Sequence, residues 1–356
     1  MKRKVVLCLL IGGILLQSIS LVGCSKKLSK YSAYSFDYFD TVTTITGYAE
    51  SQEKFDAVAG EVLAELEEYH KLYTIYHRFE GMENLCTINE LVNGEHRTVE
   101  VDSRIIDLLL YAKEMYELTD GTVNVAMGSV LSIWHEYREE GTEEPWNARI
   151  PSMEELTDAA QHTDINRVLI DTEQGTVRLE DPDMKLDVGA IAKGYAVEMA
   201  ARSLEAKGIS GYVINVGGNV RTIGLKGDGE QWLVGIENPG TDGDEAYLAY
   251  LKLSGESLVT SGSYQRYYIA DGKRYHHIID PVTLMPAEGY LSVSVVGKDS
   301  GGGDALSTAL FCMPLEEGIK LVESLPGTEA MWVSEDGTRH VSSGFDAYTE
   351  ESTKQE

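Results

Sequence analysis

The sequence has 356 residues, enough for one large domain or two medium ones with a full hydrophobic core. Hydrophobic residues make up 43% of it, which excludes an intrinsically disordered chain. The formal net charge of −28 argues against nucleic acid as a main partner and against wide contact with anionic lipid, because both of these surfaces bind basic proteins.

The N-terminus has the pattern of a bacterial lipoprotein signal. Basic residues 2–4 precede an apolar run, residues 5–16, that is too short to span a bilayer easily. The run leads to Leu21-Val-Gly-Cys24, whose spacing resembles a lipobox, in which the cysteine is acylated and the preceding peptide is removed. An ordinary signal peptide with an incidental Cys24 is the alternative. We expect residues 1–23 to be a signal peptide and Cys24 to carry the lipid (palmitate) that anchors the protein to the extracytoplasmic face of the cell membrane.

Residues 24–35 are polar and predict a short tether, residues 36–348 a single catalytic domain, and residues 349–356 a polar tail. In the first half, residues 42–48 predict a strand, and residues 168–170 and 176–179 predict a hairpin. Helices are expected at residues 55–73, at residues 104–118 before Gly121, and from Pro151 with Ser152 as its cap.

The second half is rich in strands. It predicts them at residues 212–216, 232–236, 247–253, 264–269, 277–279, 291–296 and 330–333. It predicts helices at residues 193–207, 305–313 and 315–325. Strands and helices come in blocks rather than in strict alternation, which favours an α+β fold. We expect one two-lobed catalytic unit with mixed or antiparallel sheets flanked by helices.

Four cysteines are present, of which Cys8 lies in the signal and Cys24 is the expected anchor. Cys86 and Cys312 either form one disulfide in an oxidising compartment or remain small buried residues, and the sequence leaves both possibilities open. No C-x-x-C or H-x-x-H pattern indicates a zinc site.

The most informative motif is Asp187-Val-Gly-Ala-Ile-Ala-Lys193-Gly-Tyr195, between a short apolar run and a helical pattern. Its glycines permit close approach of a ligand, and a helix N-terminus beside Lys193 attracts an anion. A plain strand-to-helix turn with a surface lysine has the same pattern.

Three further segments offer polar groups next to glycine or proline. Asn215-Val-Gly-Gly-Asn219 is neither a dinucleotide fingerprint nor a P-loop, so it is a common β-turn or a flat surface for a planar ligand. The segment from Thr260 to Arg266 is a polar hairpin entry or a source of hydroxyls and one guanidinium for phosphates. His277, before an Asp-Pro turn, is a structural histidine or a general base that works near neutral pH.

Asp304 and Thr308 follow three glycines and lie one helical turn apart. A carboxylate and a hydroxyl are hard ligands, and Mg²⁺ needs few of them because it keeps waters or phosphate oxygens. In the alternative interpretation, Asp304 only satisfies free amides at the start of the helix.

In their order and spacing, these five motifs resemble the ApbE family of FAD:protein FMN transferases, or flavin transferases. The resemblance extends from about Phe39 to the last strand. Earlier segments also match: Phe39-Asp-Thr resembles a Met-Gly-Thr-like segment, Tyr76 precedes Thr87-Ile-Asn, and Asn124-Val-Ala stands where the family has Asp-x-Thr. The chain departs from the family at Leu284, where a glycine usually follows Asp-Pro-x-Thr.

The resemblance implies that FAD lies in a cleft and that His277 is the catalytic base. It implies that Mg²⁺ is held by Asp304, Thr308 and the backbone carbonyl of Ala190. A Thr or Ser hydroxyl of a target protein attacks the FAD diphosphate, FMN becomes linked through a phosphodiester, and AMP leaves. The implied FAD contacts are Phe39, Tyr76, Asn124, Val125, Ala126, Asp187, Lys193 and Ile278.

We therefore expect an enzyme that modifies acceptor flavoproteins of membrane redox pumps or extracellular electron-transfer systems. One alternative is a Mg²⁺-dependent FAD pyrophosphatase, in which water replaces the protein hydroxyl. Another is a non-catalytic, extracytoplasmic flavin-binding lipoprotein; a generic substrate-binding lipoprotein would not need the metal-ready pair. The chain has no acceptor motif of the Asp-Gly-x-Thr/Ser-Gly-Ala-Thr kind, so we expect it to be a catalyst rather than its own target.

Overall fold

The computed structural model describes residues 27–90, 98–240 and 246–350. The predicted signal peptide, Cys24 and residues 351–356 of the predicted tail lie outside these ranges. Within them, no helix combines the length and the apolar composition that crossing a bilayer requires.

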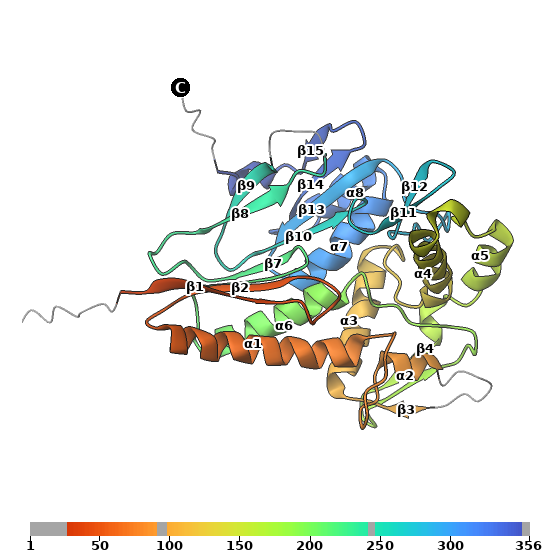
Figure 1. Ribbon diagram of the computed structural model, residues 1–356, viewed down its shortest axis with the longest axis horizontal. Helices are drawn as coiled ribbons and strands as arrows, with labels where there is room; N and C mark the ends of the chain where they lie inside the picture. The colour runs from red at the N-terminus through yellow and green to blue at the C-terminus, as the bar shows by residue number, and fades with distance from the viewer. Residues whose placement is uncertain (1–26, 91–97, 241–245, 351–356) are drawn as a thin grey trace, which may run out of the picture.

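One eight-stranded sheet forms the body of the molecule (Figure 1). Every neighbouring pair in it is antiparallel, which confirms the α+β prediction. Its strands, in spatial order, are β1 (Ser29–Ser35), β2 (Thr43–Ala49), β6 (Tyr212–Val216), β7 (Asn219–Ile223), β10 (Ser257–Gly262), β13 (Tyr290–Gly297), β14 (Glu329–Ser334) and β15 (Arg339–Val341).

The two faces of this sheet are covered differently, because successive side chains of a strand point to opposite sides. Val293 and Val295 of β13 pack with the helices, whereas Val296 packs on the other face. That other face carries the hairpin of β8 (Trp232–Glu237) and β9 (Tyr247–Leu253). The helices on the first face are α1 (Gln52–Tyr73), α6 (Ala192–Ala206), α7 (Ser300–Cys312) and α8 (Leu315–Glu323).

A second group of elements lies beside this layered body (Figure 1). Trp134, Leu156, Tyr268 and Leu284 form its apolar core. It consists of α4 (Gly128–Glu143), α5 (Met153–Ala160) and the hairpin of β11 (Tyr267–Ala270) and β12 (Lys273–His276). The remaining elements are α2 (Leu85–Glu90), α3 (Ser103–Leu118) and the small sheet of β3 (Val99–Glu100), β5 (Thr176–Leu179) and β4 (Val168–Asp171).

Elements with clear periodicity match their predictions. The strands at 212–216 and 247–253 have the predicted bounds, and the Ser152 hydroxyl caps α5 by accepting a bond from the Glu155 amide at 3.2 Å. The sequence patterns miss α2, α4, β7 and β10. Helix α4 begins after Met127 without a capping side chain, and all five residues of β7 are buried, so β7 shows no alternation.

Two predictions are wrong in the described residues, the tether at 29–35 and the strand at 277–279. Residues 29–35 do not form a tether but strand β1, which pairs with β2 from Ser29 opposite Ala49 to Ser35 opposite Thr43. The predicted polar tail begins at residues that are still bonded to the fold, because the Glu350 amide donates to the Tyr250 carbonyl at 2.8 Å. The strand predicted at 277–279 is absent, since β12 ends at His276 and the chain bends at the next residue.

Cys86 and Cys312 do not pair with each other. Cys86 is buried and Cys312 is half-buried, so they are small core residues and not a disulfide. Burial raises the pKa of both thiols, to about 11 for Cys86 and about 12 for Cys312, so both remain protonated at neutral pH.

Candidate active site

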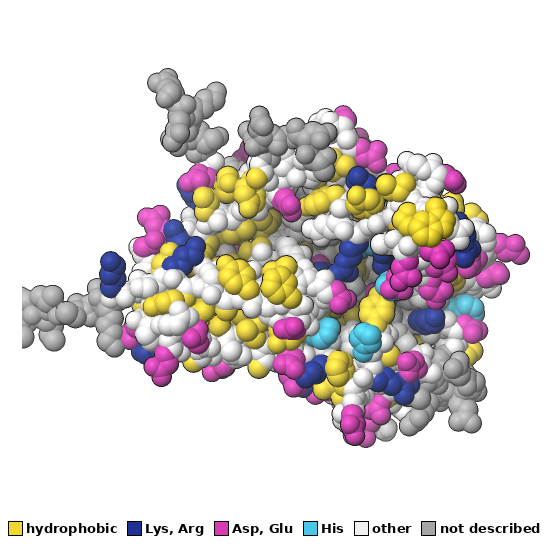
Figure 2. Space-filling model, in the orientation of Figure 1, with side chains coloured by type: hydrophobic (Ala, Val, Ile, Leu, Met, Phe, Trp, Pro, Cys, Tyr) yellow, Lys and Arg dark blue, Asp and Glu magenta, His cyan; other side chains and the backbone are white. Residues whose placement is uncertain are grey.

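A cavity of about 390 Å³ lies where the sheet meets the second group of elements. Its walls come from α4, the turn before α6, strand β10, the segment after β12 and the buried face of α7. Figure 2 shows acidic side chains spread over this face of the molecule and basic and histidine side chains gathered right of its centre. The predicted site residues that line the cavity are Tyr76, Asn124, Asp187, Ala190, Lys193, His277, Ile278, Asp304 and Thr308.

Phe39, Val125 and Ala126 are not among the residues that line the cavity, so their contact with FAD stays a prediction. The Phe39 ring packs edge-on against His70, and Val125 and Ala126 are buried in the core. The backbone of Val125 and Ala126 positions two lining residues. The Val125 carbonyl accepts a bond from the Asp187 amide at 2.8 Å, and the Ala126 amide donates to Asn124 Oδ1 at 2.9 Å.

Helices α6 and α7 approach each other closely at Gly194. A Cβ at this position would lie 2.2 Å from the Ser300 carbonyl oxygen and 2.6 Å from Asp304 Cβ, so only glycine fits without a shift of the backbone. The close approach lets the Gly194 amide donate to Asp304 Oδ2 at 2.9 Å. A residue on α7 is thereby fixed against the first turn of α6.

The start of α7 decides between the two interpretations of Asp304. The Asp299 side chain accepts from the Gly301 and Gly302 amides at 2.9 and 3.3 Å, and the Glu198 side chain accepts from the Ser300 amide at 3.0 Å. The first free amides of the helix are therefore satisfied by other carboxylates. Asp304 is not the cap, and its carboxylate lines the cavity.

The surroundings of Asp304 suit a hard cation. The Lys193 ammonium lies 3.4 Å from Asp304 Oδ2 and 3.5 Å from the Gly189 carbonyl oxygen, so a positive charge already sits among these oxygens. Thr308 Oγ1 lies 3.3 Å from Ser261 Oγ, and both residues line the same cavity together with Ala190. A carboxylate, a hydroxyl and backbone carbonyls are the donor set that Mg²⁺ takes, so these residues fit that ion.

Two arginines make part of the cavity wall basic. Arg266 Nη2 donates to the Asp40 carbonyl at 3.4 Å, and Arg138 lies on α4. Guanidinium groups bind phosphate oxygens well because they present several donors in a fixed plane. The sequence indicates Arg266 but not Arg138 or its neighbour His135, because the helix that carries them has no recognisable start.

His277 is held in one tautomer. Its Nδ1 lies 3.2 Å from the Arg266 carbonyl oxygen, which can only accept, so Nδ1 carries the proton and Nε2 has the free lone pair. Burial, followed by the charges of Arg266 and Arg138, lowers the pKa of His277 to about 3. The ring is therefore neutral at physiological pH and able to accept a proton at Nε2.

This depressed pKa has a consequence for stability that can be measured. Between about pH 6 and pH 4 the unfolded chain protonates His277 and the folded chain does not, so the free energy of unfolding falls by up to about 1.4 kcal/mol per pH unit as the pH falls. His277→Gln removes this component, and we expect its stability to depend less steeply on pH. Denaturant unfolding of both proteins at several pH values measures the difference, and equal slopes would contradict the burial of a neutral imidazole.

The departures from the family pattern keep a backbone that suits glycine. Leu284 has φ of 61° and Asp40, at the glycine position of the Met-Gly-Thr-like segment, has φ of 51°. Leu284 is buried, and its carbonyl accepts a bond from Trp134 Nε1 at 2.9 Å. The chain therefore turns here with a leucine in a left-handed conformation, which costs roughly 1–2 kcal/mol.

Two substitutions at Leu284 test whether this backbone conformation is strained, because the glycine variant should then be more stable than the alanine variant. Leu284→Ala loses the buried side chain and keeps the unfavourable φ, whereas Leu284→Gly loses the side chain but relieves the φ. We expect Leu284→Gly to be more stable than Leu284→Ala by about 1 kcal/mol, although both are less stable than the parent protein. Chemical denaturation of the three proteins checks the order. Leu284→Ala equal to or above Leu284→Gly would show that the turn relaxes away from positive φ.

A second cluster of metal-ligand type lies outside the cavity. His162, Asp181 and Asp183 bring their ligand atoms within 4.8 Å of one another. Asp181 is already engaged, because His162 Nδ1 lies 2.9 Å from its Oδ1 and Arg167 Nη1 lies 2.5 Å from its Oδ2. Arg167 neutralises the buried carboxylate and His162 is hydrogen-bonded to it, so these protein contacts explain the cluster.

Comparison with known proteins identifies relatives along most of the chain. The sequence matches the ApbE family over residues 39–332. It is 33% identical over 280 residues to an FAD:protein FMN transferase of Klebsiella pneumoniae, covering 78% of this chain and 83% of the relative.

Two solved structures share the fold. The ApbE protein of Thermotoga maritima has a TM-score of 0.77 and 30% identity, covering 91% of this chain and all of the other. The flavin transferase ApbE of Vibrio cholerae has a TM-score of 0.74 and 25% identity, covering 90% of this chain and all of the other. These findings confirm the prediction of a transferase enzyme. With the family match extending from Phe39 to Trp332, the chain belongs to the ApbE family.

Proposed function

We propose that this protein transfers the FMN moiety of FAD to a Thr or Ser hydroxyl of an acceptor flavoprotein in a Mg²⁺-dependent reaction that releases AMP. The observation that carries the proposal is the convergence of Asp304, Thr308 and the 189–190 carbonyls with a neutral histidine and two arginines on one cavity. The relatives described above are named for the same transfer.

Each group of cavity residues has its own role in this reaction. Arg138 and Arg266 bind the diphosphate, and His277 Nε2 takes the proton of the attacking hydroxyl. A new bond forms between that hydroxyl oxygen and the phosphorus on the FMN side, and the bond to the bridging oxygen breaks so that AMP leaves. Asp304, Thr308 and the Ala190 carbonyl hold Mg²⁺, which supplies charge stabilisation for the phosphate oxygens. Proton removal by His277 contributes about 10²–10⁴-fold in rate.

The flavin ring of FAD has a candidate neighbour in Tyr76. This side chain is 50% exposed, lies at the cavity and packs against the His135 ring at a centroid distance of 5.0 Å. An aromatic face at the mouth of a cavity offers stacking to a planar ligand. Desolvation of the part of its side chain that faces the cavity, followed by the charge of Asp187, raises the pKa of Tyr76 to about 12, so the phenol stays neutral.

Cellular placement is part of the proposal. We propose that Cys24 is acylated and holds the enzyme on the extracytoplasmic face of the membrane. Strand β1 begins at Ser29, so few residues separate the anchor from the folded body. The acceptors are then membrane flavoproteins of redox pumps or extracellular electron-transfer systems, whose target residue must reach this cavity.

One experiment separates transfer from the alternatives. The soluble protein that starts after Cys24 is incubated with FAD, Mg²⁺ and a candidate acceptor domain, and the mass of the acceptor is measured. If the acceptor gains the mass of one FMN, and if the His277→Gln variant adds this mass more slowly, the result supports transfer. Free FMN and AMP without an adduct supports a pyrophosphatase, and FAD bound without turnover supports a flavin-binding lipoprotein.

A further inference from the structure

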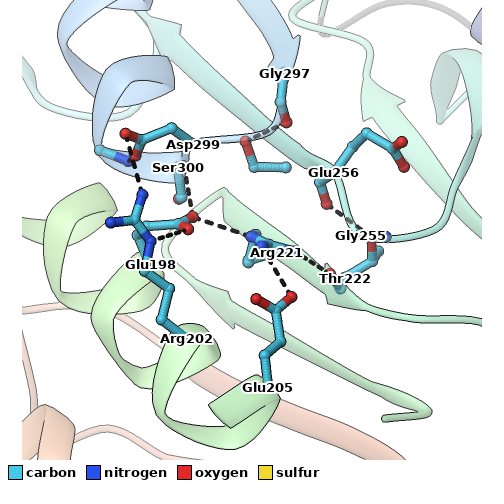
Figure 3. A network of polar contacts seen from close by, with 12 residues as sticks. Glu198, Arg202, Glu205, Arg221, Thr222, Gly255, Glu256, Gly297, Asp299 and Ser300 are labelled. Atoms are coloured by element: carbon cyan, nitrogen blue, oxygen red, sulfur yellow. Dashed lines mark hydrogen bonds and ion pairs between the residues drawn. The ribbon is translucent and has the colours of Figure 1, made fainter.

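The proposed metal ligand Asp304 depends on how α7 is held, and a buried carboxylate on α6 holds it. Glu198 is 2% exposed, and its Oε2 accepts from the Ser300 amide at 3.0 Å. Ser300 is the first residue of α7, one turn before Asp304. Figure 3 shows Glu198 pointing from α6 toward both the start of α7 and Arg221 of β7.

The carboxylate of Glu198 is itself fixed from three directions. Arg221 Nε donates to its Oε2 at 3.0 Å and Arg202 Nε donates to its Oε1 at 2.8 Å, in addition to the Ser300 amide. Arg221 is also buried and reaches Glu205 on its other side, at 3.0 Å through Nη2. A buried ion pair with all its bonds made is a poor source of stability but a strong constraint on geometry.

Ser300 is the point where the two constraints on α7 meet. Its amide bonds Glu198, and its carbonyl oxygen faces Gly194, where a Cβ would lie 2.2 Å away. Gly194 and Glu198 are four residues apart and therefore lie on the same face of α6. Together these two residues fix the distance between α6 and α7 and the position of α7 along its own axis. They therefore fix where the Asp304 carboxylate meets Gly194 and Lys193.

We propose that Glu198, oriented by Arg221, is a positioning residue for the metal site at Asp304. This inference rests on the proposed function, because it assumes that Asp304 binds Mg²⁺. Replacing a group that orients a metal ligand without itself contacting the metal typically weakens metal affinity by about 10–100-fold. Glu198 acts in this way through the helix backbone, without contact with the cavity.

The test uses Mn²⁺ as a spectroscopic probe for the metal site. Electron paramagnetic resonance measures free Mn²⁺ during titration of the full folded domain, and steady-state assays give KM for Mg²⁺ and kcat. In Glu198→Gln, an amide replaces an acceptor that three donors surround, so we expect the Kd for Mn²⁺ and the KM for Mg²⁺ to rise at least about tenfold. We expect kcat at saturating Mg²⁺ to change much less, which a general loss of folded protein would not produce.

Glu205→Gln is the matched control. It makes the same chemical change on the other side of the same guanidinium, at a side chain that is 41% exposed, and should leave the Kd for Mn²⁺ unchanged. A folded Glu198→Gln with the affinity of the parent protein overturns the inference. If that variant does not fold, Arg202→Gln replaces it, since Arg202 bonds both Glu198 and, at 3.6 Å, Asp299; unchanged affinity there also overturns the inference.

The failure of the proposed function gives a different result. Asp304→Asn is titrated in parallel, and it must lose Mn²⁺ binding if this carboxylate is a metal ligand. If the parent protein and Asp304→Asn behave alike, the metal site itself is wrong, and the inference fails with it. If Asp304→Asn loses the metal and Glu198→Gln retains it, only the positioning role fails.

Discussion

Asp304→Asn is expected to lower kcat/KM for transfer of FMN by at least about 10³-fold, since a metal ligand contributes several kcal/mol of charge stabilisation in the transition state. The neutral amide keeps an oxygen that accepts the Gly194 amide bond, so the crossing of α6 and α7 persists. The loss is therefore chemical and not structural. Acceptor mass against time, with varied Mg²⁺, measures it.

Asp183→Asn is the matched control for this variant. Asp183 belongs to the His162 cluster, the group of possible metal ligands outside the cavity, and its side chain is 71% exposed. We expect transfer at the rate of the parent protein. Equal losses in both variants would show that the acidic surface in general matters, and a fully active Asp304→Asn would remove this carboxylate from the mechanism.

Gly194→Ala is expected to lower the stability of the domain by about 1–3 kcal/mol, the usual cost of inserting a methyl group into a closely packed contact. The added Cβ would collide with the backbone of Ser300 and with Asp304 Cβ, which cannot move without moving α7. Because that movement displaces Asp304, the proposed metal ligand, we expect transfer to fall about 10²-fold even in the folded fraction. Thermal unfolding and transfer assays on the same preparation measure both effects.

Gly60→Ala provides the contrast within the same fold. Gly60 lies inside α1, and nothing is within 4 Å of the position its Cβ would take. Alanine is the better helix former by roughly 1 kcal/mol, so this variant should be more stable than the parent protein and fully active. If Gly194→Ala were as stable and active as Gly60→Ala, the close crossing of the two helices would not be needed.

Local sequence signals predicted the elements that bury one face and expose the other. Strand β6 and helix α5 are examples, because alternation and a serine cap are properties of a few neighbouring residues. The same signals failed for β7, which is buried on both faces, and for α4, which has no capping side chain. They also gave a wrong prediction for residues 29–35, whose polar composition is typical of a tether. In the structure these residues form β1, the strand at the edge of the sheet that pairs with β2.

By itself, the sequence determined the family and a set of candidate site residues, since the order and spacing of the five motifs are those of the ApbE family. Only the tertiary structure decided which of these residues lie together and which groups surround them. Lys193 and Asp304 are separated by 111 positions, and no local pattern places them 3.4 Å apart. Likewise, Asp304 was a possible helix cap until the fold showed Glu198 and Asp299 on those amides. The physical reason is that a carboxylate takes its role from the donors around it, and here those donors come from helices far apart in the chain.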